Sequence, residues 1–177
     1  MGHVGAHEWL GAMYDYGLGT RPNRRLAFTH YKIAADAGRS NAEYHVGVFY
    51  HEGRSVPKDH GMAVQWFCKA ASHGDHTAVY WLGQCYPHGR GVARDERKGF
   101  RLELAAANKG VIEAQCRWGV LRARSGRADA KKAFRWYLAA AKRGYQDAAR
   151  NLARLYESGN GTALNRQRAE YWYRRGS

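Results

Sequence analysis

The sequence predicts an all-α protein, an α-solenoid of five helix-turn-helix repeats, and three observations predict it. A pair of alanines shortly before a glycine recurs four times, and these glycines lie 36, 36 and 34 residues apart. A second set of small residues keeps the same period, and Asn or Asp recurs at a fixed place between the two sets. Such a period is the signature of stacked repeats. We place the repeats at 1–38, 39–74, 75–110, 111–144 and 145–177, as a single domain.

Each repeat is predicted to begin with one helix. In the first repeat, small and apolar residues spaced by three and four share one helix face: Ala6, Leu10, Met13, Tyr14 and Gly17. The later repeats carry an alanine in the same place, namely Ala42, Ala78, Ala114 and Ala148. A glycine follows five residues after the alanine in the first four repeats, as Gly11, Gly47, Gly83 and Gly119.

A glycine-containing loop and a second helix complete each repeat. Four loops read GLGTRPN, GRSVPKD, GRGVARD and a form shorter by two residues, SGRAD. An Asn or Asp ends each loop and is predicted to cap the second helix: Asn23, Asp59, Asp95, Asp129 and Asn165. The second helix should end at the glycine after the alanine pair, because glycine tolerates positive φ.

The small residues predict close contact between the two helices of a repeat, where a larger side chain would overpack. Three tryptophans follow the small residue of the second helix by three positions: Trp66, Trp136 and Trp172. We expect them to pack between neighbouring repeats, with a platform for nucleobases as the alternative. Neither end of the array is predicted to carry a polar capping helix.

The repeat resembles a known family. Residues 78–107 read AVYWLGQCYPHGRGVARDERKGFRLELAAA, and this pattern recurs five times over essentially the whole chain. It is similar to the Sel-like repeat (SLR), a branch of the tetratricopeptide superfamily. Departures are Leu102 and Glu103 in place of an aromatic pair, Arg122 in place of tyrosine, and the shortened fourth loop.

The resemblance implies a right-handed superhelix whose first helices line a concave groove. It also implies a non-enzymatic scaffold or adaptor that binds a partner protein in that groove. Many SLR proteins are bacterial adaptors. Some are immunity proteins that neutralise a co-encoded secreted toxin, such as a type VI secretion phospholipase, and this is the alternative function.

The same resemblance indicates which side chains face a partner. Positions two, six and nine after the alanine of each first helix point away from its packing face. From these positions and the ends of the first helices we select seven protein-binding candidates: Tyr44, His51, Tyr80, Gln84, His88, Arg150 and Arg154. The corresponding residues of the first repeat include Glu8 and Asp15, so the groove is expected to run from acidic to basic.

The net charge of +14 is unevenly distributed. Residues 111–177 hold fifteen basic and five acidic residues, a net +10, which predicts a partner with an acidic surface. Nucleic acid is a less favoured alternative: a dense basic set that includes Arg122, Arg124 and Arg127 could contact phosphates, but no recognition module is present. An anionic membrane surface is less favoured still, and no apolar run is long enough for a transmembrane helix.

No catalytic residue, cofactor or metal site is predicted. The histidine pairs His3 with His7 and His73 with His76 lack a third ligand, and no P-loop or HExxH motif occurs. His73 also lies outside the packing register, so its replacement should matter little.

The cysteines and the N-terminus also carry expectations. Cys68, Cys85 and Cys116 occupy unrelated repeat positions, which favours reduced and buried thiols over disulfides. No signal peptide is visible, so a cytoplasmic location is expected as the sequence stands, or a periplasmic or secreted one if a leader has been removed.

Overall fold

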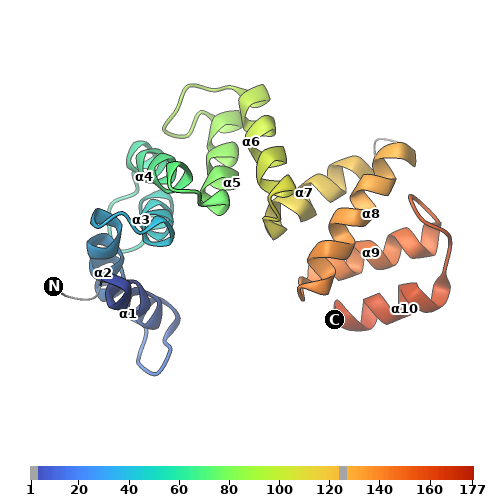
Figure 1. Cartoon of the computed structure of the whole chain (residues 1–177), viewed down its shortest axis with the longest axis horizontal. Helices are drawn as coiled ribbons and strands as arrows, with labels where there is room; N and C mark the ends of the chain where they lie inside the picture. The colour runs from blue at the N-terminus through green and yellow to red at the C-terminus, as the bar shows by residue number, and fades with distance from the viewer. Residues whose placement is uncertain (1–3, 124–126) are drawn as a thin grey trace. The chain divides into compact units, whose positions relative to one another are not determined.

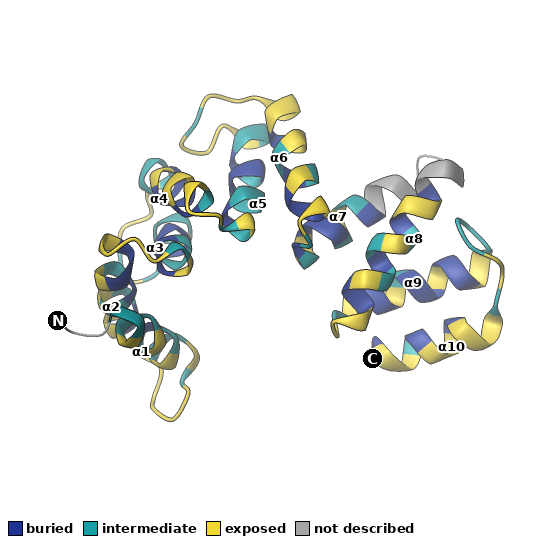
Figure 2. Ribbon diagram, in the orientation of Figure 1, coloured by how far each residue is buried: buried dark blue, intermediate teal, exposed yellow. Residues whose placement is uncertain are grey.

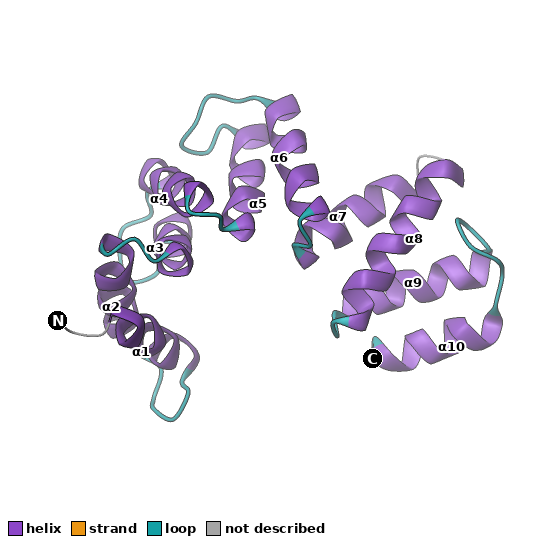
Figure 3. Cartoon of the chain, in the orientation of Figure 1, coloured by secondary structure: helices purple, strands orange, loops and turns teal. Residues whose placement is uncertain are grey.

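The structure of the chain is a computed structural model that describes residues 4–123 and 127–177, while the side chains of residues 120–129 lie outside the description. Within these ranges the chain forms ten α-helices, one 3-10 turn and no strand (Figures 1 and 3). The helices are α1 (Val4–Tyr16), α2 (Arg24–Asp36), α3 (Ser40–Glu52), α4 (His60–Ser72), α5 (His76–Cys85), α6 (Glu96–Asn108), α7 (Ile112–Ala123), α8 (Arg127–Lys142), α9 (Gln146–Ser158) and α10 (Arg166–Arg175), and the turn η1 (Tyr86–His88) follows α5. Two helices per repeat confirm the predicted helix-turn-helix array.

The predicted N-caps are confirmed in four repeats. The side-chain oxygens of these residues accept hydrogen bonds from the backbone N–H three residues later, at 2.9–3.1 Å: Asn23, Asp59, Asp95 and Asn165. The fifth prediction is wrong, because α8 begins at Arg127 and Asp129 therefore lies within its first turn. The predicted linker SGRAD is two residues shorter in sequence than the others, and its Arg127 already belongs to α8.

The second helices of the first four repeats end as predicted. A glycine follows each of them in the left-handed region, with φ of 80°, 88°, 89° and 88° at Gly38, Gly74, Gly110 and Gly144. A side chain with Cβ is disfavoured at such angles, which explains why the position is glycine each time.

The described chain divides into two compact units, Met1–Leu102 and Glu103–Ser177. In each unit the buried residues lie between consecutive helices (Figure 2). In the first unit, one core cluster joins α2, α3 and α4 around Tyr31 and Phe49, and another joins α3, α4 and α5 around Phe67. In the second unit the cluster joins α8, α9 and α10 around Leu152. This burial between neighbours is the packing of an α-solenoid, while a single domain and a right-handed superhelix remain predictions.

Glycines of the first helices make room for aromatic rings of the second helices. A Cβ added to Gly47 would lie 2.6 Å from the Phe67 ring, and one added to Gly11 would lie 2.7 Å from the Tyr31 ring. Gly119 stands in the same relation to Tyr137. The small residues of the repeat are therefore required by packing.

The tryptophan prediction holds for two residues of three. Trp66 is 5% exposed and Trp172 is 7% exposed, and each belongs to a core cluster that joins successive helices. Trp136 is only half-buried. The buried pair is committed to packing, which leaves no stack of tryptophans for nucleobases at these two positions.

The third repeat differs from the others in its buried core, at the position where its sequence lacks the aromatic residue. Glu103 occupies the position of the rings of Tyr31, Phe67 and Tyr137, and it is fully buried. Its carboxylate accepts a hydrogen bond of 3.0 Å from Nε of Arg117. An ionised carboxylate is costly to bury without such a charge-assisted partner.

Candidate protein-binding surfaces

Two of the predicted binding residues, Arg150 and Arg154, line one hollow in the second unit. The hollow has a volume of about 390 Å³ and lies between α7 and α9, the first helices of repeats four and five. Its lining residues are Cys116, Arg117, Asp147, Arg150, Asn151 and Arg154. Three arginines and one exposed aspartate therefore line this space. We call this space the arginine hollow.

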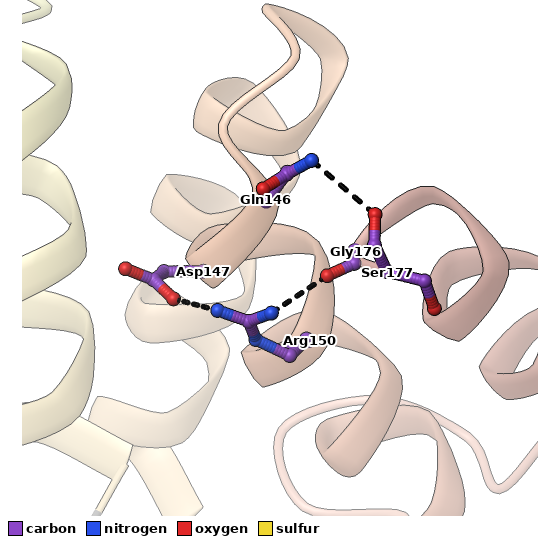
Figure 4. Close-up of polar contacts among 5 residues, drawn as sticks. All are labelled: Gln146, Asp147, Arg150, Gly176 and Ser177. Atoms are coloured by element: carbon purple, nitrogen blue, oxygen red, sulfur yellow. Dashed lines mark hydrogen bonds and ion pairs between the residues drawn. The ribbon is translucent and has the colours of Figure 1, made fainter.

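Arg150 is held in place by two neighbours (Figure 4). Its guanidinium group donates to the backbone oxygen of Gly176 at 2.7 Å and forms an ion pair with Asp147, three residues before it on α9. Gln146 donates to the backbone oxygen of Ser177 at 3.3 Å, so the end of the chain is tied to α9 (Figure 4). Arg150 thus has a structural role besides any role in binding, and substituting it would loosen this tie.

Arg154 is exposed one helical turn further along α9. It lies near the Tyr173 hydroxyl, which donates a hydrogen bond of 2.9 Å to Glu157. Burial raises the pKa of Tyr173, and the hydrogen bond to the Glu157 carboxylate raises it further. Tyr173 therefore stays a neutral hydrogen-bond donor beside Arg154.

The thiol in the arginine hollow is not activated. Burial, together with the carboxylates of Asp147 and Glu113, raises the pKa of Cys116 to about 12. Burial likewise raises the pKa of Cys85 to about 11 and raises that of Cys68. All three cysteines are free. Burial was predicted for all three: Cys85 is buried, Cys116 is half-buried, and the prediction is wrong for Cys68, which is exposed.

The other candidates lie in the first unit, and most of them are partly buried. Tyr44 packs against the core cluster around Phe67, with 6.2 Å between the two ring centroids. Tyr80 and Gln84, both on α5, are half-buried, and His88 is exposed in η1. Tyr44 is thus tied to the core, and His88 is the most accessible of these four.

His51 lies among rings. Its centroid is 5.2 Å from Trp81 and 5.0 Å from His60, and its Nδ1 is buried. Burial lowers the pKa of His51 to about 4, and the neighbouring His60, Arg90 and Lys58 lower it in the same direction. The side chain is a neutral, packed imidazole at neutral pH. A partner would meet its edge rather than a positive charge.

The acidic residues of the first repeat are already paired. Glu8 accepts hydrogen bonds from Arg39 at 2.9 Å and from Asn41 at 2.7 Å. Burial acts to raise the pKa of Glu8, but these hydrogen bonds and the Arg39 charge outweigh it, so the pKa is lowered. Asp15 is 6% exposed at the side chain and lies 3.9 Å from Arg54. The predicted acidic end of the groove therefore presents little free negative charge.

Sequence reasoning missed the long-range pair of Glu43 and His73, among others. The buried carboxylate of Glu43 lies 2.8 Å from Nδ1 of His73, although 30 positions separate the two residues. His73 was predicted to be dispensable, and this contact corrects the prediction, because its loss would leave a buried carboxylate without this hydrogen bond. The signal available in the sequence was weak: a histidine just before the glycine that ends a second helix.

No group of three or more metal-ligating side chains occurs among the described residues. His7 does contact a histidine, His30, with 2.9 Å between the two Nδ1 atoms, but its predicted partner His3 lies outside the described residues. Arg122, Arg124 and Arg127 also lie outside the described side chains. In the described part of the chain, no helix is both long and apolar enough to span a bilayer.

The geometry defines a class of protein, an α-solenoid of helix hairpins, in which three arginines line a hollow on two first helices of the second unit. The Sel1 repeat family model matches residues 4–38, 40–75, 76–111, 112–145 and 146–177, so the chain belongs to the Sel1 repeat family. The family repeat is generally a non-catalytic scaffold for protein–protein interaction. No curated relative matches the chain significantly.

Solved structures with the same fold cover nearly the whole chain. A Sel1 repeat protein from Oxalobacter formigenes is 24% identical, with a TM-score of 0.89 over 99% of this chain and 51% of that protein. A protective antigen of uropathogenic Escherichia coli with an SLR fold is 28% identical, with a TM-score of 0.76 over 99% of this chain and 38% of that protein. An immunity protein from Pseudomonas aeruginosa is 22% identical, with a TM-score of 0.68 over 99% of this chain and 68% of that protein. The chain thus spans about half of the first of these proteins and less of the second.

Proposed function

We propose that this chain is a non-enzymatic scaffold that binds an acidic segment of a partner protein in the arginine hollow. The observation that carries the proposal is the convergence of Arg117, Arg150 and Arg154 on one space of about 390 Å³. Residues 111–177 around it carry a net +10, which would draw an acidic partner toward this unit.

The chemistry of the hollow suits carboxylates. An Arg side chain presents a planar fork of donors that matches a carboxylate bidentately. Each of the three has a partner: Arg117 bonds Glu103, Arg150 bonds Asp147 and Gly176, and Arg154 lies against the neutral hydroxyl of Tyr173. Asn151 adds an amide at the edge of the same space. A partner carboxylate at Arg154 would also lie near the neutral hydroxyl of Tyr173.

The first unit carries a separate set of proposed contacts, which are less charged. Tyr44, His51, Tyr80, Gln84 and His88 remain proposed contacts there. They offer ring edges and amide groups, which suit apolar and neutral polar side chains of a partner. The charged contacts of the partner belong to Arg150 and Arg154 in this proposal.

A charge-matched pair of variants tests the arginine hollow. Arg154→Glu reverses one charge in it, and Arg135→Glu makes the same change at an exposed site of α8. Titration with a fluorescent Glu-rich peptide should show a loss of about tenfold or more for the first variant, because repulsion replaces attraction at a contacting charge. The second should weaken binding only slightly. Equal weakening by both variants would mean that the peptide reads net charge and not this site.

Immunity to a secreted toxin is the second candidate function. It is favoured by the strong positive charge, because fast inhibition of an acidic toxin benefits from electrostatic steering. The Pseudomonas aeruginosa protein described as an immunity protein motivates the idea. At 22% identity, however, the similarity supports only a shared fold. The test is co-expression with any toxin encoded beside this gene. We expect the wild type and Arg135→Glu to rescue growth and Arg154→Glu to fail. No rescue by the wild type would exclude that toxin.

A further inference from the structure

The side of α8 that is turned away from the core is lined by basic residues (Figure 2). Five exposed cations lie at spacings of three, four, seven and eight residues and so share this side: Lys131, Lys132, Arg135, Lys142 and Arg143. The opposite side of α8 holds Ala133, Tyr137 and Ala140, which are buried in the core cluster of the second unit. Both α7 and α9 pack on this helix, so the exposed side belongs to an internal repeat. We call the five cations the α8 basic face.

The charges of this face are not neutralised within the described part of the chain. Four of the five cations form no ion pair and no side-chain hydrogen bond with any described residue. The fifth, Arg143, donates to the backbone oxygen of Gly110 at 2.8 Å, and this neutral acceptor leaves its charge uncompensated. Residues 131–143 also contain no Asp or Glu. The α8 basic face therefore presents five positive charges to a ligand.

This density does not follow from the basic composition of the chain alone. At the five equivalent positions, the second helix of the first repeat has one cation, Arg25, and that of the second repeat has no Lys or Arg. The second helix of the third repeat, α6, has four. However, α6 begins with Glu96, and one of its four cations, Lys98, lies over the ring of Tyr86 at 4.4 Å. The α8 basic face is thus the strongest of these charged surfaces.

The other residues of α8 indicate which polyanion fits this face. A bilayer is held by apolar side chains as well as by charge, and none of the large apolar side chains that are exposed in the described chain lies on α8. A single strand stacks its bases on exposed rings, but the aromatic residues of α8 are buried or half-buried. A duplex carries its phosphates on the outside and requires only cations. The face is about 18 Å long at 1.5 Å per residue, which corresponds to about five base steps of 3.4 Å.

We propose that the α8 basic face binds the phosphate backbone of a nucleic-acid duplex without reading its sequence. Three of its five cations are lysines, which bind phosphates as point charges and impose no planar geometry on them. The face lies on a second helix, whereas the arginine hollow lies on the first helices α7 and α9. Duplex binding is therefore a separate activity, and it does not rest on the binding of an acidic partner.

Two charge-matched double variants test the proposal. Lys131→Glu with Arg135→Glu reverses two charges of the α8 basic face, and Arg21→Glu with Arg25→Glu reverses two charges in the first repeat. All four side chains are exposed, so both variants should keep their helical fold, which circular dichroism checks. The binding of a short fluorescein-labelled duplex of mixed sequence is measured by fluorescence anisotropy over a series of salt concentrations. The same proteins are titrated with the Glu-rich peptide and with vesicles that contain phosphatidylserine.

The expected outcome separates this face from net charge and from the arginine hollow. The α8 variant should lose about tenfold or more in duplex affinity at low salt, and its log–log salt slope should be shallower by about two, because each phosphate contact contributes about one. The first-repeat variant and Arg154→Glu should bind the duplex almost as the wild type does, and the α8 variant should keep the Glu-rich peptide. No duplex binding by the wild type at low salt, or equal weakening by the two double variants, would overturn the proposal. Vesicle or peptide binding that the α8 variant loses while it keeps the duplex would also overturn it, by pointing to a membrane surface or an acidic protein.

Discussion

Replacing Gly47 of α3 by alanine should change the stability of the chain through two opposing effects, helix propensity and packing. Alanine in a helix interior is favoured over glycine by about 1 kcal/mol. The added Cβ, however, would lie 2.6 Å from two ring carbons of Phe67 and 3.3 Å from the backbone oxygen of Ala63. Phe67 is fully buried and has the Trp81 ring stacked against it, so it has little room to move away. Overpacking of this kind costs about 1–3 kcal/mol, so after the gain in helix propensity the net expectation is a loss of up to about 2 kcal/mol.

Gly5→Ala is the matched control, because a Cβ there meets nothing within 4 Å. It should be neutral or stabilising by up to about 1 kcal/mol. Denaturant unfolding at 25 °C, followed by circular dichroism, measures both variants against the wild type. If Gly47→Ala proves as stable as Gly5→Ala, then the close approach of helix and ring does not constrain the repeat, and the packing argument fails.

Three further predictions concern stability. His73→Ala should destabilise the chain by about 1–2 kcal/mol by removing the hydrogen bond to buried Glu43, whereas His76→Ala should have almost no effect; equal melting temperatures for the two variants would contradict the role of this contact. Because the pKa of folded His51 is about 4, below the 6.5 of a free imidazole, the unfolded chain binds more protons between these values, so stability should fall as pH falls through this window. In His51→Phe, the decrease in unfolding free energy over this pH range should be smaller by about 1–3 kcal/mol. If denaturant unfolding shows the same pH dependence of stability for wild type and variant, the lowered pKa of His51 is refuted. Ala140→Leu, at a fully buried position of α8, should cost about 1–3 kcal/mol by overpacking, and a melting temperature equal to that of the wild type would argue against it.

The features that the sequence predicts well are local. Helix pairs, glycine stops and four of the five N-caps each depend on residues a few positions apart, so a period of 36 residues is enough to find them. Asp129 fails because a loop shortened by two residues moves the helix start, and a period alone does not fix where a helix begins.

The features that it misses depend on contacts between repeats. The pairing of Glu43 with His73 and the tie from Arg150 to Gly176 join residues 30 and 26 positions apart. His51 was selected because it points away from the packing face of its own helix, but the next repeat brings Trp81 against it. The choice of Arg150 and Arg154 rested on helix register, and the structure adds that Arg117 lines the same hollow.

The most direct test of the proposed function is calorimetric titration of the wild type with a Glu-rich peptide, the same peptide with Gln in place of Glu, and a generic DNA duplex. Each titration is run at low and at moderate salt. The proposed function predicts that the Glu peptide binds, that the Gln peptide does not, and that the Glu peptide exceeds the duplex at moderate salt, because carboxylates fit the arginine hollow while phosphate binding weakens steeply with salt. Tighter binding of the duplex at both salt concentrations, or equal binding of the Glu and Gln peptides, would contradict it.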